Sequence, residues 1–292
     1  MASAELRQIR RRIRSVQSTM KITRAMELIA TSRIARAQIR VAQNQPYTTK
    51  MTEVIRNIAA ASGGLRHPLL ESREVSTAGV LVITSDRGLA GGYNINVIRM
   101  AERHLLDQRH QDRHVRLYTV GKKAESYFRY RKYQIQRSWL AVTDTPNYGD
   151  ARSIANVLLH EYQDGAVDSV AMFTTRYLSA FTQTPVLWPL LPIEPPEMDD
   201  VAAAPIGYNF EPAPDEILDR LLPRYLEGSV FGVLLEASAS EHAARRRAMK
   251  AATENAEDLT RLLTREGNQA RQAEVTTEIS EIVGGAEALT GG

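Results

Sequence analysis

The segment Ser85–Asn94 carries three glycines directly after an apolar run, and it is the part of the sequence most like a ligand-binding loop. A glycine-rich loop at the start of a helix can turn backbone N–H groups toward a phosphate. The spacing here is Gly-x-x-Gly-Gly rather than Gly-x-Gly-x-x-Gly, and no Gly-Lys-Ser/Thr follows to complete a P-loop. We therefore interpret the loop as a tight strand-to-helix turn in which glycine tolerates positive φ.

Two charged side chains of this loop, Asp86 and Arg87, are candidates for catalysis. Asp86 has no neighbouring histidine or second carboxylate, and an aspartate at a strand end more often caps a turn or a helix. The sequence also lacks the Gly-x-Ser-x-Gly nucleophile elbow. We predict no catalytic residue and no bound cofactor. The competing hypothesis is a nucleotide-dependent enzyme, which tight binding of ATP or NAD by the isolated chain would support.

Metal and thiol chemistry are disfavoured by residue usage. The chain has no cysteine, which excludes disulfides, Cys-zinc sites and thiol-based redox control. Its six histidines show no His-Glu-x-x-His or other metal-binding spacing, so we predict no metal site.

The net charge of +3 conceals a strong asymmetry. Residues 1–40 contain ten Arg or Lys and two acidic residues, which gives +8, so the rest of the chain carries −5. Such a segment is typical of a solvated helix face, of an arm that binds nucleic acid or anionic lipid, or of a helix seated among acidic partners. Against nucleic acid, Arg10–Arg12 spread charge around the helix and no aromatic stacking residue is interleaved. Steeply salt-dependent binding to DNA or RNA would support that alternative.

The elements that must position these residues begin with a long helix, predicted over residues 1–61. No glycine or proline occurs before Pro46. Apolar residues recur in steps of three and four, which is the repeat of a coiled-coil seam. They are Leu6, Ile9, Ile13, Val16 and Met20. A helix of about 45 residues would be roughly 65–70 Å long, so much of it must project beyond a small domain.

A second long helix is predicted over residues 215–292, with Pro214-Asp215 as its start signal. Pro223 is expected to bend or delay this start, and Gly267 is a lone interior glycine. Neither long helix can bury its apolar stripe alone. Because the two lie at opposite ends of the chain, we predict that they pair as an antiparallel coiled coil.

Between them, residues 78–193 predict an α/β domain, because short apolar runs alternate with helical patterns of 10–15 residues. Strands are predicted at Ala78–Thr84, His114–Val120, Tyr133–Trp139, Val167–Arg176 and Leu178–Trp188, the last as an antiparallel edge. Helices are predicted at Tyr93–Asp107, Lys122–Arg131 and Ala151–Tyr162. The proline-rich residues 194–214 are predicted to form a loop.

Four stretches of the sequence, in collinear order, resemble the gamma subunits of bacterial F-type ATP synthases. They are Ile22–Ser32, Ser85–Asn94, Ser240–Arg245 with Ala248–Ala256, and Asn268–Ile279. The resemblance implies a Rossmann-like α/β domain inserted between the two coiled-coil helices. It also implies a central rotor shaft that couples ion flow through a membrane c-ring to ATP synthesis or hydrolysis in a ring of alpha and beta subunits.

The resemblance also implies contact residues, partners and a location. Met26, Arg245, Arg271, Gln272 and Thr276 match family positions that approach the alpha/beta ring. At the base, Tyr208, Phe210 and Glu211 match a segment that faces the c-ring and the epsilon subunit, with Phe210 in place of the commoner tyrosine.

The expected partners are therefore the alpha, beta, epsilon and c subunits, with no nucleic acid. The chain is expected to be non-catalytic by itself and peripheral to the cytoplasmic face of a bacterial membrane, without direct insertion. No apolar stretch approaches the roughly 18 residues of a membrane span. Ala90 stands where many relatives have cysteine, so thiol control is not expected. A static coiled-coil scaffold stays open as the alternative to a rotor.

Overall fold

The computed structural model describes residues 4–61, 67–194, 211 and 213–290. These residues group into two compact units, and the two long helices α1 (Ala4–Ala61) and α5 (Pro214–Thr290) contribute to both. One unit holds the chain up to Ile29 and from Arg246 onward, and the other holds Ala30–Arg245. Among the described residues, no helix has an apolar stretch long enough to cross a membrane.

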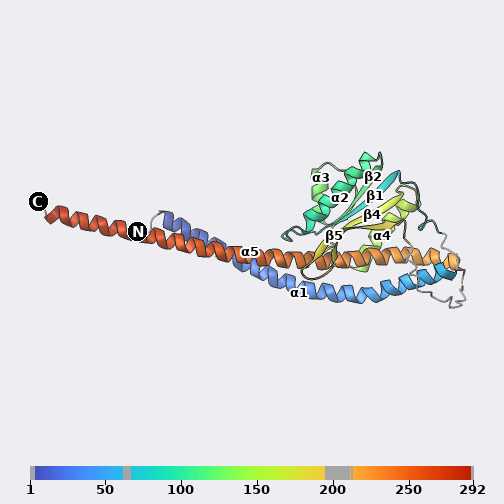
Figure 1. The fold of residues 1–292 in the computed structure, drawn as a ribbon, viewed down its shortest axis with the longest axis horizontal. Coiled ribbons are helices and arrows are strands. Elements are labelled where there is room, and N and C mark those ends of the chain that lie inside the picture. Colours follow the sequence, from blue (N-terminus) through green and yellow to red (C-terminus); the bar gives the residue numbers. More distant parts are fainter. Residues whose placement is uncertain (1–3, 62–66, 195–210, 212, 291–292) are drawn as a thin grey trace. The chain divides into compact units, whose positions relative to one another are not determined.

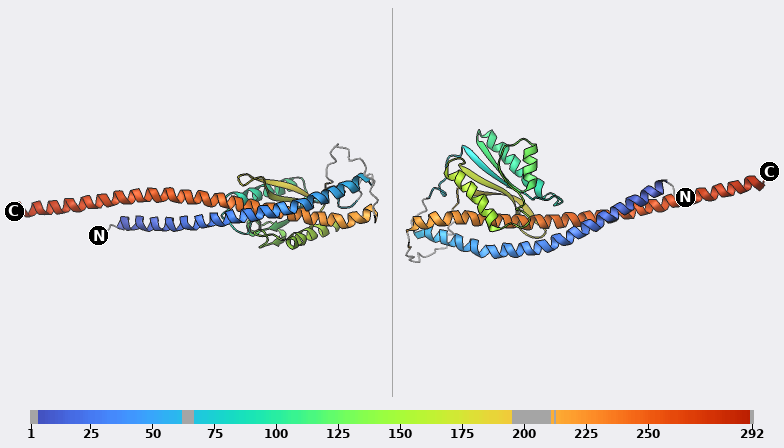
Figure 2. Two further views of the ribbon diagram at one scale, coloured as in Figure 1. Left: turned by 90° about the horizontal axis from the view of Figure 1, so that it is seen from below. Right: turned by 180° about the vertical axis from the view of Figure 1, so that it is seen from behind.

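In the terminal unit, the first half of α1 runs antiparallel to the last part of α5. Ile9 lies beside Gly267, and Thr23 lies beside Thr253. A step of fourteen residues forward along α1 is thus matched by fourteen residues backward along α5. Figure 2 shows the two helices side by side with opposite directions in both of its views. The predicted antiparallel pairing of the two chain ends is confirmed.

The predicted seam is also found, since all five of its apolar residues on α1 are buried or half-buried. Gly267 has a specific role in this packing. A Cβ atom at that position would lie 3.3 Å from the Cγ2 atom of Ile9, so the missing side chain lets the two helices approach closely.

The central unit is built on a five-stranded sheet with the order β3-β2-β1-β4-β5 (Figure 1). The strands are β1 (Thr77–Ile83), β2 (His114–Val120), β3 (Ile135–Trp139), β4 (Ser169–Tyr177) and β5 (Gln183–Leu191). The first four are parallel, and β5 pairs with β4 in the antiparallel direction, as predicted for the edge.

Helices cover both faces of the sheet, which is why β1 is buried at every position from 78 to 83 rather than at alternate ones. Val80 and Val82 face α2 (Tyr93–His110) and α3 (Lys122–Tyr130). Leu81 and Ile83 belong to a second core with α4 (Tyr148–Gln163) and with the parts of α1 and α5 in this unit. This is the mixed, Rossmann-like α/β arrangement that was predicted (Figure 1).

The long helices also run antiparallel within the central unit. A Cβ atom on Gly232 would lie 3.3 Å from the amide of Asn44, and one on Gly228 would lie 3.3 Å from the ring of Tyr47. The two glycines are one helical turn apart on α5, and they let α1 approach its backbone.

Several element boundaries differ from prediction, and the structure gives a local reason at the starts of α4 and β5. Helix α4 begins at Tyr148, before the predicted Ala151, because Asn147 and Asp150 form a capping box. Strand β5 begins at Gln183, after the predicted Leu178, because residues 178–182 form a turn. Helix α5 begins at Pro214 and continues through Pro223, so the predicted delay at that proline is wrong.

Candidate functional site

The loop from Ser85 to Asn94 lies at the carboxyl end of β1, and its polar groups are held by each other. The side-chain oxygen of Asn94 accepts hydrogen bonds from the backbone N–H of Ser85 at 2.8 Å and from the Ser85 hydroxyl at 2.9 Å. Leu89 and Gly91 both have positive φ, of 61° and 56°. The loop is therefore the tight strand-to-helix turn that the glycine spacing predicted.

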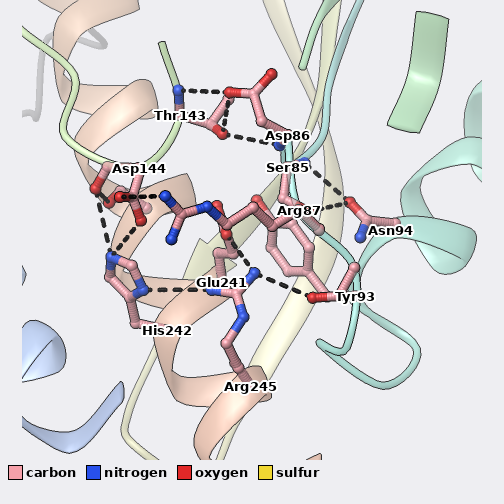
Figure 3. Close-up of polar contacts among 12 residues, drawn as sticks. Ser85, Asp86, Arg87, Tyr93, Asn94, Thr143, Asp144, Glu241, His242 and Arg245 are labelled. Atoms are coloured by element: carbon pink, nitrogen blue, oxygen red, sulfur yellow. Dashed lines mark hydrogen bonds and ion pairs between the residues drawn. The ribbon is translucent and has the colours of Figure 1, made fainter. Parts of the chain in front are cut away.

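Asp86 occupies the position where this loop meets the first turn of α3. Its carboxylate accepts from the Lys122 N–H at 3.1 Å. It also accepts from the Thr143 hydroxyl at 2.9 Å (Figure 3). The Thr143 hydroxyl in turn accepts from the Asp86 N–H at 3.1 Å. The N-terminus of a helix favours an anion, and here the chain's own carboxylate supplies it.

A second donor of the same helix terminus is also occupied. The Thr84 hydroxyl accepts from the Ala124 N–H at 2.9 Å. Gly121, just before α3, has φ 90°, and a Cβ atom there would lie 2.2 Å from the Thr84 carbonyl oxygen. The end of β1 and the start of α3 are thus too close for any other residue at position 121.

Helix α5 fills the crevice at the carboxyl ends of β1 and β4. In open α/β sheets, ligands bind between two neighbouring strands from which the chain continues toward opposite edges of the sheet. β1 and β4 are such strands, because β1 is followed by β2 on one side and β4 by β5 on the other. The Tyr93 hydroxyl donates to the Ala237 carbonyl at 3.1 Å, and the Ser240 hydroxyl donates to the Thr175 carbonyl at 3.2 Å. Both contacts join the sheet to α5 at the place where a nucleotide would otherwise bind.

Next to these contacts lies a network of charged groups, buried at Glu241, His242 and Arg245 and exposed at Arg87, which we call the α5 ion-pair network. Its members are Arg33, Arg87, Asp144, Glu241, His242 and Arg245. Arg245 donates to the Glu241 carboxylate at 2.6 Å and to the Gly88 carbonyl at 3.3 Å (Figure 3). Asp144 pairs with Arg33 of α1, and its carboxylate lies 3.9 Å from Arg87.

Burial shapes the protonation of this network. It lowers the pKa of His242 to about 4, so the imidazole is neutral at pH 7. The ring Nε2 lies 3.4 Å from the Asp144 carbonyl oxygen and Nδ1 lies 3.5 Å from an Arg245 nitrogen, which fits a neutral ring that donates through Nε2. Burial also raises the pKa of Glu241, which Arg245 partly opposes, and raises that of Tyr93 well above its usual value.

Asp144, Glu241 and His242 could in principle hold a metal, because their ligand atoms lie within 4.8 Å of one another. The charges around them favour a different interpretation. Arg33 and Arg245 already pair with the two carboxylates, and Arg87 lies near the first. The guanidinium groups already pair with these carboxylates and would repel a cation that approached them. We interpret the group as an ion-pair network.

The residues expected to contact the alpha/beta ring fall in both units. In the terminal unit Met26 is half-buried, whereas Arg271, Gln272 and Thr276 are exposed on α5. Arg245, in the central unit, is 7% exposed and engaged within the chain. Glu211 is exposed, and the other two expected base residues, Tyr208 and Phe210, lie outside the described residues.

Sequence reasoning did not single out Asp144, Thr143 or Arg33 as site residues. One signal was available for the rest of the network. Glu241 and Arg245 stand four positions apart in an alanine-rich stretch of α5. Oppositely charged residues at this spacing lie on one helix face and pair.

Comparisons with known proteins give one consistent result. A family model described as ATP synthase matches residues 5–289. The chain is 48% identical to the ATP synthase gamma chain of Saccharopolyspora erythraea, over 98% of both chains. It is 46% identical to that of Mycolicibacterium smegmatis, over 99% of both chains.

Among solved structures, a chain of the Euglena gracilis mitochondrial ATP synthase (OSCP, F1 and c-ring) has a TM-score of 0.67 at 16% identity, covering 98% of this chain and 94% of that one. A chain from the central stalk and c-ring of the Tetrahymena thermophila enzyme has a TM-score of 0.59 at 22% identity, covering 79% of this chain and 99% of that one. At these identities the likeness concerns the fold.

Proposed function

The chain belongs to the ATP synthase gamma-chain family, and from this membership we propose that it is the central rotor shaft of a bacterial F-type ATP synthase. The observation that carries the proposal is identity of 46–48% to gamma chains over nearly the full length of both sequences. This favours a rotor over a static scaffold or a nucleic-acid-binding coiled coil.

In this role the terminal unit acts through contacts that depend on its orientation. Each catalytic site of the alpha/beta ring meets a different face of the antiparallel helix pair as the pair turns. A shaft can favour one conformation of a site only by interacting better with that conformation. The exposed polar groups of Arg271, Gln272 and Thr276, with Met26 on α1, are the proposed contacts.

The proposed base of the rotor is the segment with Tyr208, Phe210 and Glu211, which faces the c-ring and the epsilon subunit. The chain would then be peripheral, on the cytoplasmic face of the membrane, and held there by the c-ring. This expectation is supported by the solved chains that this chain resembles in fold, because both are named as parts of assemblies with a c-ring.

The chain is proposed to be non-catalytic by itself. Two features of the central unit support this. The crevice between β1 and β4 is filled by Ala237–Arg245 of α5, and the N-terminus of α3 is occupied by Asp86 and Thr84. In both places the groups just named are already hydrogen-bonded within the chain, which argues against a phosphate site there. Equilibrium dialysis of the isolated chain with ATP is expected to detect no binding at millimolar concentration, and tight binding would contradict this part of the proposal.

Co-purification tests the function as a whole. A tagged chain expressed in its own cells is expected to bring down alpha, beta and epsilon subunits in fixed proportion. ATPase activity should appear in that assembly and not in the isolated chain. Recovery of the chain without these subunits, or with nucleic acid in their place, would contradict the rotor assignment.

A further inference from the structure

Arg245 connects helix α5 to the β1–α2 loop. Its guanidinium donates to the Glu241 carboxylate at 2.6 Å and to the Gly88 carbonyl at 3.3 Å, and it lies 3.5 Å from the His242 ring. The planar guanidinium presents its donors in a fixed fork, so its orientation decides whether the Gly88 carbonyl receives a hydrogen bond.

Glu241 sets that orientation. It lies one helical turn before Arg245 and is only 1% exposed, so its carboxylate has few alternatives to the guanidinium. One carboxylate oxygen accepts from Arg245, while the other is buried and accepts no hydrogen bond within the described part of the chain. A charge-assisted bond to a carboxylate in this setting is strong and directional.

The carbonyl that Arg245 holds lies between the two most exposed side chains of the loop. The Arg87 side chain is 64% exposed and Leu89 is 62% exposed. Leu89 adopts a φ of 61°, which a leucine takes up only where its surroundings impose it. Holding the Gly88 carbonyl therefore fixes the Gly88–Leu89 peptide, which Leu89 adjoins directly and from which Arg87 is one residue away.

We propose that Glu241 is a positioning residue for the loop: it orients Arg245 so that the guanidinium binds the Gly88 carbonyl and fixes the direction of Arg87 and Leu89. Arg245 thus serves the loop from inside the chain, in addition to any contact it makes in an assembly. The loop then moves with the part of α5 that lies in the central unit, a consequence that rests on the proposed rotor function.

Hydrogen–deuterium exchange on the isolated full chain tests the positioning. The reporter amides are those of Ser85, Asp86 and Tyr93, which are hydrogen-bonded within or next to the loop. In Glu241→Gln the neutral side chain no longer holds the guanidinium strongly, and exchange at these amides is expected to rise several-fold. Exchange in β1 and in α5 should stay unchanged.

The matched control is Glu254→Gln. Glu254 has the same four-residue spacing to a cation on the same helix, but its pair with Lys250 is exposed, with 3.8 Å between the charged atoms. It should leave the loop amides unchanged. Unchanged exchange in Glu241→Gln, or an equal rise in both variants, would overturn the proposal.

Arg245→Lys provides a second route if Glu241→Gln destabilises the fold. Lysine keeps the positive charge beside Glu241, but its single ammonium cannot replace the fork that reaches Gly88. Loop exchange is expected to rise as in Glu241→Gln, while the melting temperature stays close to that of the parent chain. A lysine variant with a fully protected loop would overturn the proposal.

In the assembled complex, Glu241→Gln is expected to lower the ratio of ATP synthesis to ATP hydrolysis while the subunits still co-purify. A complex that forms and keeps an unchanged ratio counts against the positioning role. A parent chain that does not enter a complex at all counts against the proposed function instead, because the exchange experiment does not depend on assembly.

Discussion

The hydroxyl oxygens of Thr23 and Thr253 lie 2.7 Å apart, buried between the two helices of the terminal unit, although 230 positions separate them in the chain. Each hydroxyl also lies within hydrogen-bonding distance of a backbone carbonyl of its own helix, that of Met20 or of Met249. This polar pair fixes the register of an otherwise apolar seam.

Replacing either threonine by valine is expected to destabilise the chain by about 1 kcal/mol, because the remaining buried hydroxyl loses its partner on the other helix. The double variant Thr23→Val/Thr253→Val should cost less than the sum of the two single changes. A double-mutant cycle from urea unfolding measures the difference. Thr264→Val is the control, since that exposed hydroxyl bonds only within its own helix. Strictly additive costs would contradict the pairing.

His242 predicts a pH dependence of stability. Its pKa is lowered from 6.5 to about 4 in the folded chain, so the unfolded chain binds the proton more readily. The free energy of unfolding is therefore highest above pH 6.5. It decreases as the pH falls toward 4, by up to about 1.4 kcal/mol per pH unit. His242→Gln keeps a donor and an acceptor without titrating, so its stability should fall less over this range. Parallel curves for the two proteins would be the contrary result.

Gly121 and Gly165 form a matched pair of glycines with positive φ, 90° and 70°. An alanine Cβ at position 121 would lie 2.2 Å from the Thr84 carbonyl oxygen, whereas one at 165 meets nothing within 4 Å. Gly165→Ala should lower the free energy of unfolding by about 1–2 kcal/mol, because backbone strain alone is added. Gly121→Ala should cost at least about 3 kcal/mol or prevent folding, because a clash is added. Thermal unfolding compares the two, and equal costs would show that the close approach is unimportant.

Gln272 tests the proposed contacts of the rotor with the alpha/beta ring. Because its side chain is exposed on α5, Gln272→Ala should change stability by no more than about 0.5 kcal/mol. Coupled ATP synthesis by the complex should nevertheless fall several-fold. Arg103→Ala, an exposed change on α2, is the control and should affect neither quantity. Unchanged synthesis in Gln272→Ala would remove this residue from the contact set.

The periodicity of apolar residues predicted the fold well, because it reports directly on which faces are buried. The steps of three and four on α1 predicted a coiled-coil seam, and the apolar run at Ala78–Thr84 predicted the strand that the structure shows as β1. The errors came from local hydrogen bonds that periodicity does not register. The capping box of Asn147 and Asp150 extends α4 toward its N-terminus, and the turn at 178–182 delays β5.

The α5 ion-pair network could be predicted only in part. The spacing of Glu241 and Arg245 is visible in the sequence, since it places both on one helix face. Asp144 and Arg33 belong to a loop and to another helix, and their approach depends on how three distant segments pack. No local pattern encodes that packing. Arg245 was assigned from family resemblance to an external contact, and its bonds to Glu241 and Gly88 became apparent only in the folded chain.

Helix α5 occupies the crevice that other α/β proteins leave open for a small molecule, and this has a consequence for control. A ligand shifts an equilibrium only through a difference in its affinity for two states, and a blocked crevice offers ATP or ADP no such difference. We therefore expect this chain to show no direct response to the energy charge of the cell. Any adjustment of its turning to nucleotide supply must be sensed by the neighbours that surround it.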